Sequence, residues 1–333
     1  MTVRVVDGRG VRELLPMATC IEKVADALAS LARGDAVQPL RMAVWQPDRA
    51  GLLGVMPAWL GGDVNASGVK VVSVFPGNHG SELDAHQGVV LLFEGTQGRL
   101  LAIIDASEVT AIRTAAASAV ATRVLARQDA SELLVVGTGI QARTHIEAIA
   151  CVRALRRVRV HGRDLARARD FATRESARLG LHVEAVEDLR DAVGSADIVC
   201  LATSAKAPVL LGAWLRAGTH VNAVGACTPA ARELDGEAVA RARLYCDRRE
   251  SLFAEAGDFL LARAEGLVTD AHVVGELGEV LIGTVPGRRD ESEITLFESL
   301  GLGIEDVAVA HHIHAQACAR GVGLALALGG ERA

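Results

Sequence analysis

A glycine-rich turn in the middle of the chain is the feature that most constrains the fold. Residues 132–142 read ELLVVGTGIQA, and the apolar run 133–136 suits a buried parallel strand. In G-x-G-x-x-A spacing the first glycine permits a tight turn and the second lets the backbone approach a pyrophosphate. The third small residue lets helix and strand pack closely. The turn therefore predicts a dinucleotide site built by Gly137, Thr138, Gly139, Ile140, Gln141 and Ala142.

Strands and helices alternate from residue 132 onward. After the first strand we expect strands over 158–161, 181–186, 197–203, 220–225 and, as the last, 243–247. Helical patterns separate them over 140–155, 165–179, 186–193 and from 251 onward. This rhythm predicts an α/β fold with a Rossmann doubly wound parallel sheet, which we place at residues 121–305.

The first 120 residues have a different pattern. One helix is expected over 17–33, and the extended segments that follow lie at 41–45, 52–59, 69–75, 89–94 and 100–105. Two long helical patterns, 111–126 and 304–328, lie outside the sheet domain. Residues 1–120 and 306–333 are therefore predicted to form one mixed α+β domain into which the Rossmann domain is inserted.

Composition excludes several classes of partner. A net charge of −6 without a Lys/Arg block, and 3% aromatic residues, argue against nucleic acid as a ligand. No apolar run approaches the roughly 18–20 residues that span a bilayer, and the charged N-terminus predicts no signal peptide. The six separated cysteines are expected to be reduced, mostly buried thiols of a cytoplasmic protein. We expect no metal, because His311, His312 and His314 would point in different directions on a helix.

The end of the second strand bears on the choice of dinucleotide. An acidic residue at this place usually binds the ribose 2′-hydroxyl of NAD, whereas an arginine accommodates the 2′-phosphate of NADP. Gly162, Arg163 and Asp164 stand here, so we expect all three to bind cofactor and NADPH to be favoured, with NADH possible. The alternative is that Arg163 is a solvated cation and Asp164 only caps the next helix.

Three cations stand in sparsely charged surroundings. Lys70 lies in the apolar run 69–75, where an unpaired ammonium would cost several kcal/mol if buried. It therefore either reaches an anion, with a substrate carboxylate as the better interpretation, or lies on an exposed edge strand. Arg113 lies in the small-residue helix start 110–118, and Arg41 begins an extended run. Together these cations could clamp a carboxylate, because guanidinium binds carboxylates through two hydrogen bonds.

With these residues in place, the chain resembles the ornithine cyclodeaminase/μ-crystallin family, nearly from end to end. The resemblance rests on a set of motifs in order: Gln38-Pro39-Leu40-Arg41, Leu53-Gly54-Val55-Met56-Pro57-Ala58, Lys70 ahead of Phe75-Pro76-Gly77-Asn78, His86-Gln87 before Val90-Leu91-Leu92-Phe93, Thr110–Ser118, the GTGIQA turn, Asn222-Ala223-Val224-Gly225-Ala226 and Glu276-Leu277-Gly278-Glu279. The family implies a Rossmann domain inserted in a substrate and dimerisation domain, and hence a homodimer.

The resemblance also implies site residues. Arg41, Lys70 and Arg113 match positions that hold the substrate carboxylate next to the nicotinamide, and Leu300 matches a substrate contact. Lys70 is the expected catalytic residue. Further positions resemble cofactor contacts: His86, Arg113, Thr203, Val224, Gly225, Ala226 and Ser299.

One departure separates activities within the family. Ornithine cyclodeaminases carry an aspartate, their general acid/base, at the position of Cys227, and the family lysine is replaced by Ala231. A thiol with an ordinary pKa near 8.5 is a poor substitute for a carboxylate. The segment 223–235 instead resembles the ketimine-reductase branch, which includes Δ1-pyrroline-2-carboxylate reductases. We therefore expect NAD(P)H-dependent reduction of small cyclic imino acids; the alternatives are an amino-acid dehydrogenase acting on alanine or N-alkylamino acids, and a non-catalytic NADPH-dependent binding protein.

Overall fold

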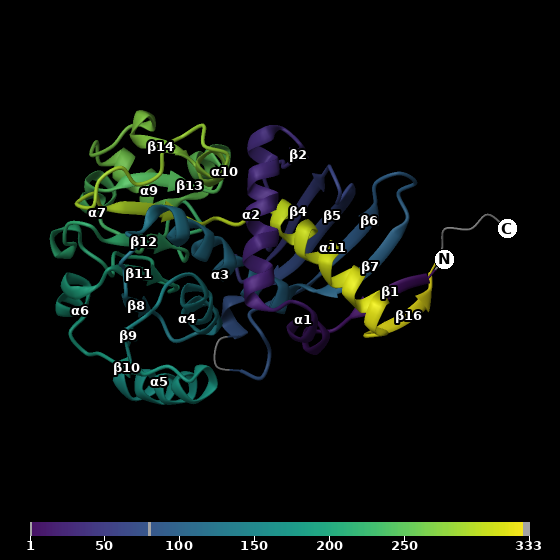
Figure 1. Ribbon diagram of the computed structural model, residues 1–333, viewed down its shortest axis with the longest axis horizontal. Coiled ribbons are helices and arrows are strands. Elements are labelled where there is room, and N and C mark those ends of the chain that lie inside the picture. The colour runs from purple at the N-terminus through teal and green to yellow at the C-terminus, as the bar shows by residue number, and fades with distance from the viewer. Residues whose placement is uncertain (1, 79–80, 329–333) are drawn as a thin grey trace. The chain divides into compact units, whose positions relative to one another are not determined.

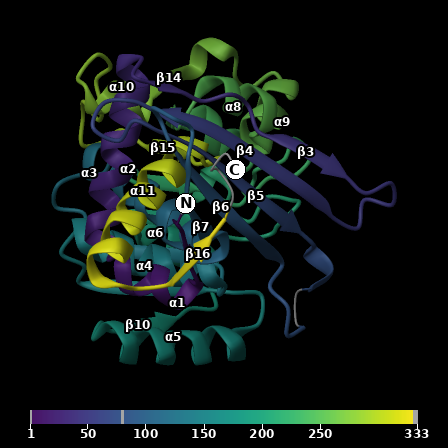
Figure 2. The same cartoon turned by 90° about the vertical axis from the view of Figure 1, so that its right-hand side faces the viewer.

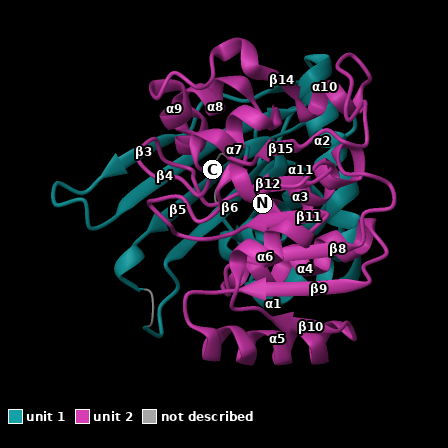
Figure 3. Ribbon diagram, turned by 90° about the vertical axis from the view of Figure 1, so that its left-hand side faces the viewer, with its two compact units in different colours: residues 1–113, 302–333 teal, residues 114–301 magenta. Residues whose placement is uncertain are grey.

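The chain folds into two compact units, which Figure 3 colours separately. The structure is a computed structural model that describes residues 2–78 and 81–328. Unit 1 comprises residues 1–113 and 302–333, and unit 2 comprises residues 114–301. The predicted domain boundaries at 120/121 and 305/306 fall inside helices α3 and α11 and remain a prediction; residues 329–333 of the predicted first domain lie outside the described residues.

Unit 1 is built on a mixed sheet with the strand order β16-β1-β7-β6-β5-β4-β2, and β3 pairs with β4 as well. Its elements are β1 (Thr2–Val6), α1 (Gly8–Leu14), α2 (Met17–Arg33), β2 (Ala36–Val37), β3 (Met42–Trp45), β4 (Leu52–Leu60), β5 (Ala66–Val74), η1 (Pro76–Asn78), β6 (His86–Glu94), β7 (Leu100–Asp105), the first part of α3 (Ala106–Leu125), α11 (Gly303–Arg320) and β16 (Leu324–Ala327). Figure 2 shows β3 and β4 extending as a hairpin.

One face of the unit 1 sheet is covered by α11, as Figure 1 shows. The cross-strand row Met56, Lys70, Val90 and Ile104 is almost fully buried, so this row is apolar apart from one lysine. The backbone approaches closely here, because a Cβ on Gly303 would lie 2.9 Å from the Met56 carbonyl oxygen. The first turn of α11 therefore packs directly on β4, beside the strand β5 that carries Lys70.

Unit 2 contains the predicted parallel sheet, and its strand order is β10-β9-β8-β11-β12-β15-β13-β14. Every pair in it is parallel. Its strands are β8 (Glu132–Val136), β9 (Arg157–His161), β10 (Val183–Ala185), β11 (Ile198–Leu201), β12 (His220–Ala223), β13 (Arg243–Cys246), β14 (Val273–Glu276) and β15 (Thr295–Glu298). The helices are α4 (Ile140–Val152), α5 (Leu165–Leu179), α6 (Leu189–Ser195), α7 (Gly236–Arg241), α8 (Arg249–Glu255), α9 (Gly257–Ala264) and α10 (Leu277–Leu281), with η2 (Gly212–Trp214) and η3 (Asp270–His272). The predicted fold class is confirmed.

Some predicted elements were wrong. The strand at 243–247 is not the last, because β14 and β15 follow it and β15 lies between β12 and β13. Both are four-residue strands, too short for a clear periodic signal. The helix predicted over 304–328 ends at Arg320, since Gly321 adopts a left-handed conformation (φ 69°), and the chain returns as β16. Of the six cysteines, which were predicted to be mostly buried, Cys20, Cys200 and Cys246 are buried, Cys227 is half-buried, and Cys151 and Cys318 are exposed.

Within the described residues, no helix combines the length and the apolar character needed to cross a bilayer.

Candidate functional site

The glycine-rich turn joins β8 to α4 as predicted. Gly137 has a φ of 127°, and a Cβ there would lie 2.4 Å from the Ala202 carbonyl oxygen, so only glycine fits. Gly139 is the N-cap residue of α4 and has no side chain to occupy the helix N-terminus. A Cβ on Gly139 would meet no atom of the described residues within 4 Å. The open backbone at the start of a 13-residue helix suits an anion such as a pyrophosphate.

The end of β9 lies beside this turn. A Cβ on Gly162 would come within 2.9 Å of the Thr138 Cγ2 atom, so glycine is needed for this approach. Arg163 is exposed. The Asp164 carboxylate caps α5 by accepting hydrogen bonds from the backbone N–H groups of Ala166 (2.9 Å) and Arg167 (3.1 Å). The cap prediction for Asp164 is confirmed, and this capping role leaves Arg163 as the stronger candidate for reading the ribose substituent.

The other predicted cofactor positions in unit 2 gather at the carboxyl ends of β11, β12 and β15. These strands are neighbours, and their ends are linked by backbone hydrogen bonds from Val224 to Leu201 (3.1 Å) and from Ser299 to Ala223 (2.9 Å). Parallel α/β sheets bind their ligands at this edge. The residues brought together here are Thr203, Val224, Gly225, Ala226, Ser299 and Leu300.

Two buried carboxylates hold these strand ends in place. The Glu233 oxygens accept one backbone N–H each, from Thr203 and from Gly225, both at 2.7 Å. Asp247 Oδ2 accepts the backbone N–H groups of Leu300 (2.7 Å) and Gly301 (2.6 Å). Burial raises the pKa of Glu233, while the hydrogen bonds from Thr203, Gly225 and Val224 lower it. No sequence motif predicted a role for Glu233 or Asp247, since their partners lie on other strand ends.

Unit 1 places Lys70 inside its sheet rather than at an edge. Lys70 lies on β5 between β4 and β6 and is 2% exposed, so the edge-strand alternative was wrong. Its ammonium lies 3.1 Å from Asp306 Oδ2 and 3.2 Å from Oδ1, and it donates a hydrogen bond to Thr110 Oγ1 at 3.3 Å. Burial lowers the pKa of Lys70 to about 8, assisted by Arg113, while Asp306 and Glu305 raise it.

Arg113 shares this buried cluster. Its Nε atom donates to Asp306 Oδ1 at 3.3 Å, and its Nη1 atom donates to Glu305 Oε2 at 3.1 Å. Asp306 therefore contacts both predicted substrate-binding cations of the cluster. Two cations and two carboxylates pair here beneath α11, where a lone charge would be costly. The first turn of α11 supplies both acids, which sequence reasoning missed because acidic residues at a helix start usually face solvent.

The remaining predicted residues of unit 1 lie nearby or apart. Arg41 directly precedes Met42 of β3, and the strand registers (Met42 with Val55, Met56 with Lys70) set it beside Met56, two strands from Lys70. Arg41 is half-buried. His86 begins β6, opposite Val74, and is exposed. The binding roles of Arg41 and His86 remain predictions.

Cys227 is half-buried in the loop after β12. Its thiol donates to the carbonyl oxygens of Val224 (3.2 Å) and Ser299 (3.8 Å). A thiol therefore stands at the position where the family resemblance implies an aspartate in ornithine cyclodeaminases.

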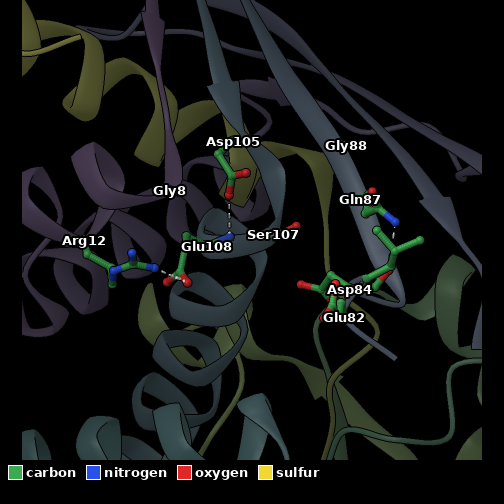
Figure 4. Close-up of a pocket in the computed structure, with 10 residues that line it drawn as sticks. Gly8, Arg12, Glu82, Asp84, Gln87, Gly88, Asp105, Ser107 and Glu108 are labelled. Atoms are coloured by element: carbon green, nitrogen blue, oxygen red, sulfur yellow. Dashed lines mark hydrogen bonds and ion pairs between the residues drawn. The ribbon is translucent and has the colours of Figure 1, made fainter. Parts of the chain in front are cut away.

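An acidic pocket of unit 1 lies elsewhere, between the start of α3 and the loop before β6 (Figure 4). It is an open depression of about 470 Å³, and its lining includes Glu82, Asp84, Asp105 and Glu108, with Arg12 paired to Glu108. Neither Lys70 nor Arg113 lines it. An acidic lining would repel a carboxylate, so this pocket does not suit a substrate of that kind.

Known proteins resemble the chain over most of its length. It is 36% identical over 291 residues to the ketimine reductase mu-crystallin of Mus musculus. The aligned residues cover 86% of this chain and 88% of that protein. The structure of Thermococcus litoralis Δ1-pyrroline-2-carboxylate reductase, in complex with NADH and L-proline, matches with a TM-score of 0.94 and 37% identity, covering 97% of this chain and 99% of that one. An archaeal alanine dehydrogenase dimer with bound NAD matches with a TM-score of 0.92 and 29% identity, covering 99% and 100%.

The sequence profile of the ornithine cyclodeaminase/mu-crystallin family matches residues 3–321, nearly the whole chain. With the dinucleotide turn, the buried lysine–arginine cluster and these relatives, the chain belongs to the ornithine cyclodeaminase/mu-crystallin family.

Proposed function

We propose that this protein is an NAD(P)H-dependent reductase of cyclic ketimine carboxylates. The substrates are Δ1-pyrroline-2-carboxylate, giving L-proline, and Δ1-piperideine-2-carboxylate, giving L-pipecolate. The observation that carries the proposal is the buried Lys70–Arg113 pair in a chain that also has a dinucleotide turn. Its relatives include a ketimine reductase and a Δ1-pyrroline-2-carboxylate reductase. Cys227, in place of an aspartate, argues against cyclodeaminase activity.

The substrate carboxylate binds Arg113, Lys70 and Arg41. Guanidinium groups suit this task because they offer two parallel N–H donors to a carboxylate. Asp306 and Glu305 already accept hydrogen bonds from the Nε and Nη1 atoms of Arg113. They therefore fix the direction in which the remaining N–H donors of this guanidinium point. The substrate contact that the family resemblance implies for Leu300 stays a prediction.

The residues of unit 2 fit a dinucleotide. The open Gly139 backbone and the α4 N-terminus hold the pyrophosphate, Gly162 and Arg163 receive the adenosine ribose, and the strand ends at Thr203, Gly225 and Ser299 hold the nicotinamide half. When bound, the reduced nicotinamide supplies the hydride for the C=N bond. The Arg163 side chain favours a ribose 2′-phosphate and therefore NADPH.

Lys70 donates the proton that the reaction consumes. Reduction of C=N to CH–NH takes up one hydride and one proton, and the imine accepts hydride more readily once its nitrogen is protonated. A pKa of about 8 lets the Lys70 ammonium share its proton near neutral pH, as a general acid should. Asp306 keeps the ammonium oriented.

The test is NADPH and NADH oxidation with the two cyclic ketimines, compared with pyruvate plus ammonia. We expect turnover with the ketimines, and Lys70→Ala and Arg113→Ala should each lower kcat/KM by at least about 100-fold. Lys23→Ala on α2 is the matched lysine control. Near-normal turnover in both site variants overturns the proposal. Preference for pyruvate plus ammonia would indicate an amino-acid dehydrogenase, and nucleotide binding without any turnover a binding protein.

We also propose that the protein is a cytoplasmic homodimer in proline or pipecolate metabolism. The strands β2 and β3 expose apolar side chains, including Val37 (60%), Met42 (60%) and Val44 (67%), and a second copy would cover this face. The archaeal alanine dehydrogenase match is itself a dimer. Light scattering should give twice the mass of one chain, and Met42→Asp/Val44→Asp should give the single-chain mass; a monomeric parent protein contradicts the dimer.

A further inference from the structure

The segment after β12 contains a carboxylate that touches two loops of the nucleotide site at once. Glu233 is fully buried, and its Oε1 and Oε2 atoms each accept a backbone N–H at 2.7 Å. One N–H belongs to Thr203, which follows β11, and the other to Gly225, which follows β12. A single side chain therefore sets the spacing between two adjacent strand-end loops.

Glu233 is itself held rigidly. Its backbone carbonyl accepts the N–H groups of Val209 (2.7 Å) and Leu210 (3.0 Å), and its own N–H donates to Asp258 Oδ1 at 2.8 Å. The fit against Gly225 is tight, since a Cβ there would lie 2.1 Å from the Thr203 carbonyl oxygen and 2.7 Å from the Glu233 carboxyl carbon. Glu233 and the two loops that it joins, at Thr203 and Gly225, form what we call the clamp. Its atoms have little room to move.

The strand order of the sheet indicates which half of a dinucleotide would lie against the Thr203 and Gly225 loops. Strand order reverses at β8, with β9 and β10 on one side and β11 and β12 on the other. In such folds the adenosine ribose lies at the end of the second strand, here β9, and the pyrophosphate at the first turn. The second mononucleotide half, with the nicotinamide, then lies over the ends of β11 and β12.

We propose that Glu233 is a positioning residue for the nicotinamide half of the cofactor, acting by holding the Thr203 and Gly225 loops at a fixed separation. It does not touch the reacting atoms. The proposal rests on the proposed use of a nicotinamide dinucleotide. A site held in advance loses less freedom when the ligand binds, so loosening the clamp weakens binding of that half selectively.

The test compares Glu233→Gln with the parent protein. A glutamine has one acceptor oxygen, and its NH2 group would face the second backbone N–H, so one loop loses its partner. The two ligands are NADPH and 2′-phospho-ADP-ribose, which keeps the adenosine half and pyrophosphate but lacks nicotinamide. We expect the Kd for NADPH to rise by about 10- to 100-fold, and that for the fragment to change less than about threefold.

The matched control is Asp235→Asn, two residues away. Asp235 also accepts two backbone N–H groups, from Gly212 (2.8 Å) and Ala238 (2.9 Å), but neither belongs to a nucleotide loop. It should leave the ratio of the two Kd values unchanged. Glu233→Asp keeps the charge but is too short to reach both loops, so it should shift the ratio in the same direction and carries the test if Glu233→Gln does not fold.

If Glu233→Gln weakens the binding of NADPH and of 2′-phospho-ADP-ribose equally, or leaves NADPH binding unchanged, the positioning role is overturned. A parent protein that binds NADPH but reduces no ketimine would refute the proposed function alone, and the ratio would still decide the role of Glu233. A parent protein that binds neither NADPH nor NADH overturns both.

Discussion

At the scale of single residues, the charge on Lys70 depends on its neighbours. Burial and Arg113 lower the pKa of its ammonium to about 8, and Asp306 opposes them. Activity that needs the ammonium is complete below this pKa and is lost as pH rises through it. We therefore expect kcat/KM for ketimine reduction to fall above about pH 8.

Replacing Asp306 with asparagine should move that fall. Asp306→Asn removes the attraction that raises the pKa of Lys70, so the decline in kcat/KM should shift to lower pH by about one unit or more. The measurement is the pH profile of kcat/KM for both proteins. Glu305→Gln removes a carboxylate of the same cluster whose effect on the Lys70 pKa is smaller, and should shift the profile less. An unmoved profile, or a shift upward, would contradict the coupling.

Arg163 carries a second prediction at this scale. It is exposed beside Gly162, while Asp164 is engaged as a helix cap. Arg163→Ala should lower kcat/KM with NADPH by about 10- to 100-fold, because a charge-assisted hydrogen bond to a phosphate is lost. Values with NADH should stay within about twofold. Arg169→Ala, an exposed arginine further along α5, is the control. An equal loss with both cofactors would show that Arg163 does not read the 2′-phosphate.

At the scale of elements, two glycines of one turn do different work. Gly137 joins β8 to the turn with a φ of 127° and lies against the Ala202 backbone. Gly139 is the N-cap residue of α4, with an ordinary φ of −97°, and has open space where a Cβ would stand. The first glycine serves the fold of the strand–helix unit, and the second serves the approach of a ligand.

Alanine at each glycine should separate the two roles. Gly137→Ala should lower the free energy of unfolding by roughly 2 kcal/mol or more, because alanine is strained at this φ and collides with the Ala202 carbonyl. Gly139→Ala should leave the melting temperature nearly unchanged and weaken NADPH binding at least about tenfold. Calorimetry of unfolding and of binding measures both. Normal NADPH affinity in Gly139→Ala would falsify the assignment of the pyrophosphate to this turn.

At the scale of the whole molecule, unit 2 buries carboxylates close enough to repel one another. Asp258 accepts two backbone N–H groups through Oδ1, at 2.8 and 2.7 Å. Burial and the charge of Glu233 raise its pKa to about 7. Burial and the charges of Asp258, Glu233 and Asp247 raise the pKa of Glu298 well above its ordinary value. Asp258 and Glu298 therefore stabilise the folded chain more when they are protonated than when they are charged.

The contribution of Asp258 to stability should therefore fall as pH rises from about 4 to 7. In this window the folded state holds more protons on Asp258 than the unfolded chain does, since the Asp258 pKa is raised from 3.8 to about 7. Asp258→Asn resembles the protonated acid at every pH. Its melting temperature should match the parent at or below about pH 4 and exceed it by a margin that grows up to about pH 7, reaching a few degrees at pH 8. Asp188→Asn, at the exposed cap of α6, should show no growing difference, and a parallel pH course for Asp258→Asn would contradict the prediction.

Much of unit 2 could be predicted from sequence because its signals are local. The turn at 137–142, the helix over 165–179 and the strand at 158–161 follow from glycine spacing, a capping aspartate and short apolar runs. Strands β14 and β15 were missed, although β15 lies in the middle of the sheet. A four-residue strand is defined by its hydrogen-bonded neighbours, and these are distant in sequence.

The sequence by itself determined the parallel-sheet class, the dinucleotide turn and the identity of Lys70 and Arg113 as unusual cations. Only the tertiary structure decided what those cations touch, because Asp306 lies 236 residues from Lys70 and reaches it through the packing of α11 on the sheet. The same holds for Glu233, whose two partners follow different strands. Backbone propensity and apolar spacing act between chain neighbours, whereas the partner of a buried charge is chosen by which elements pack together.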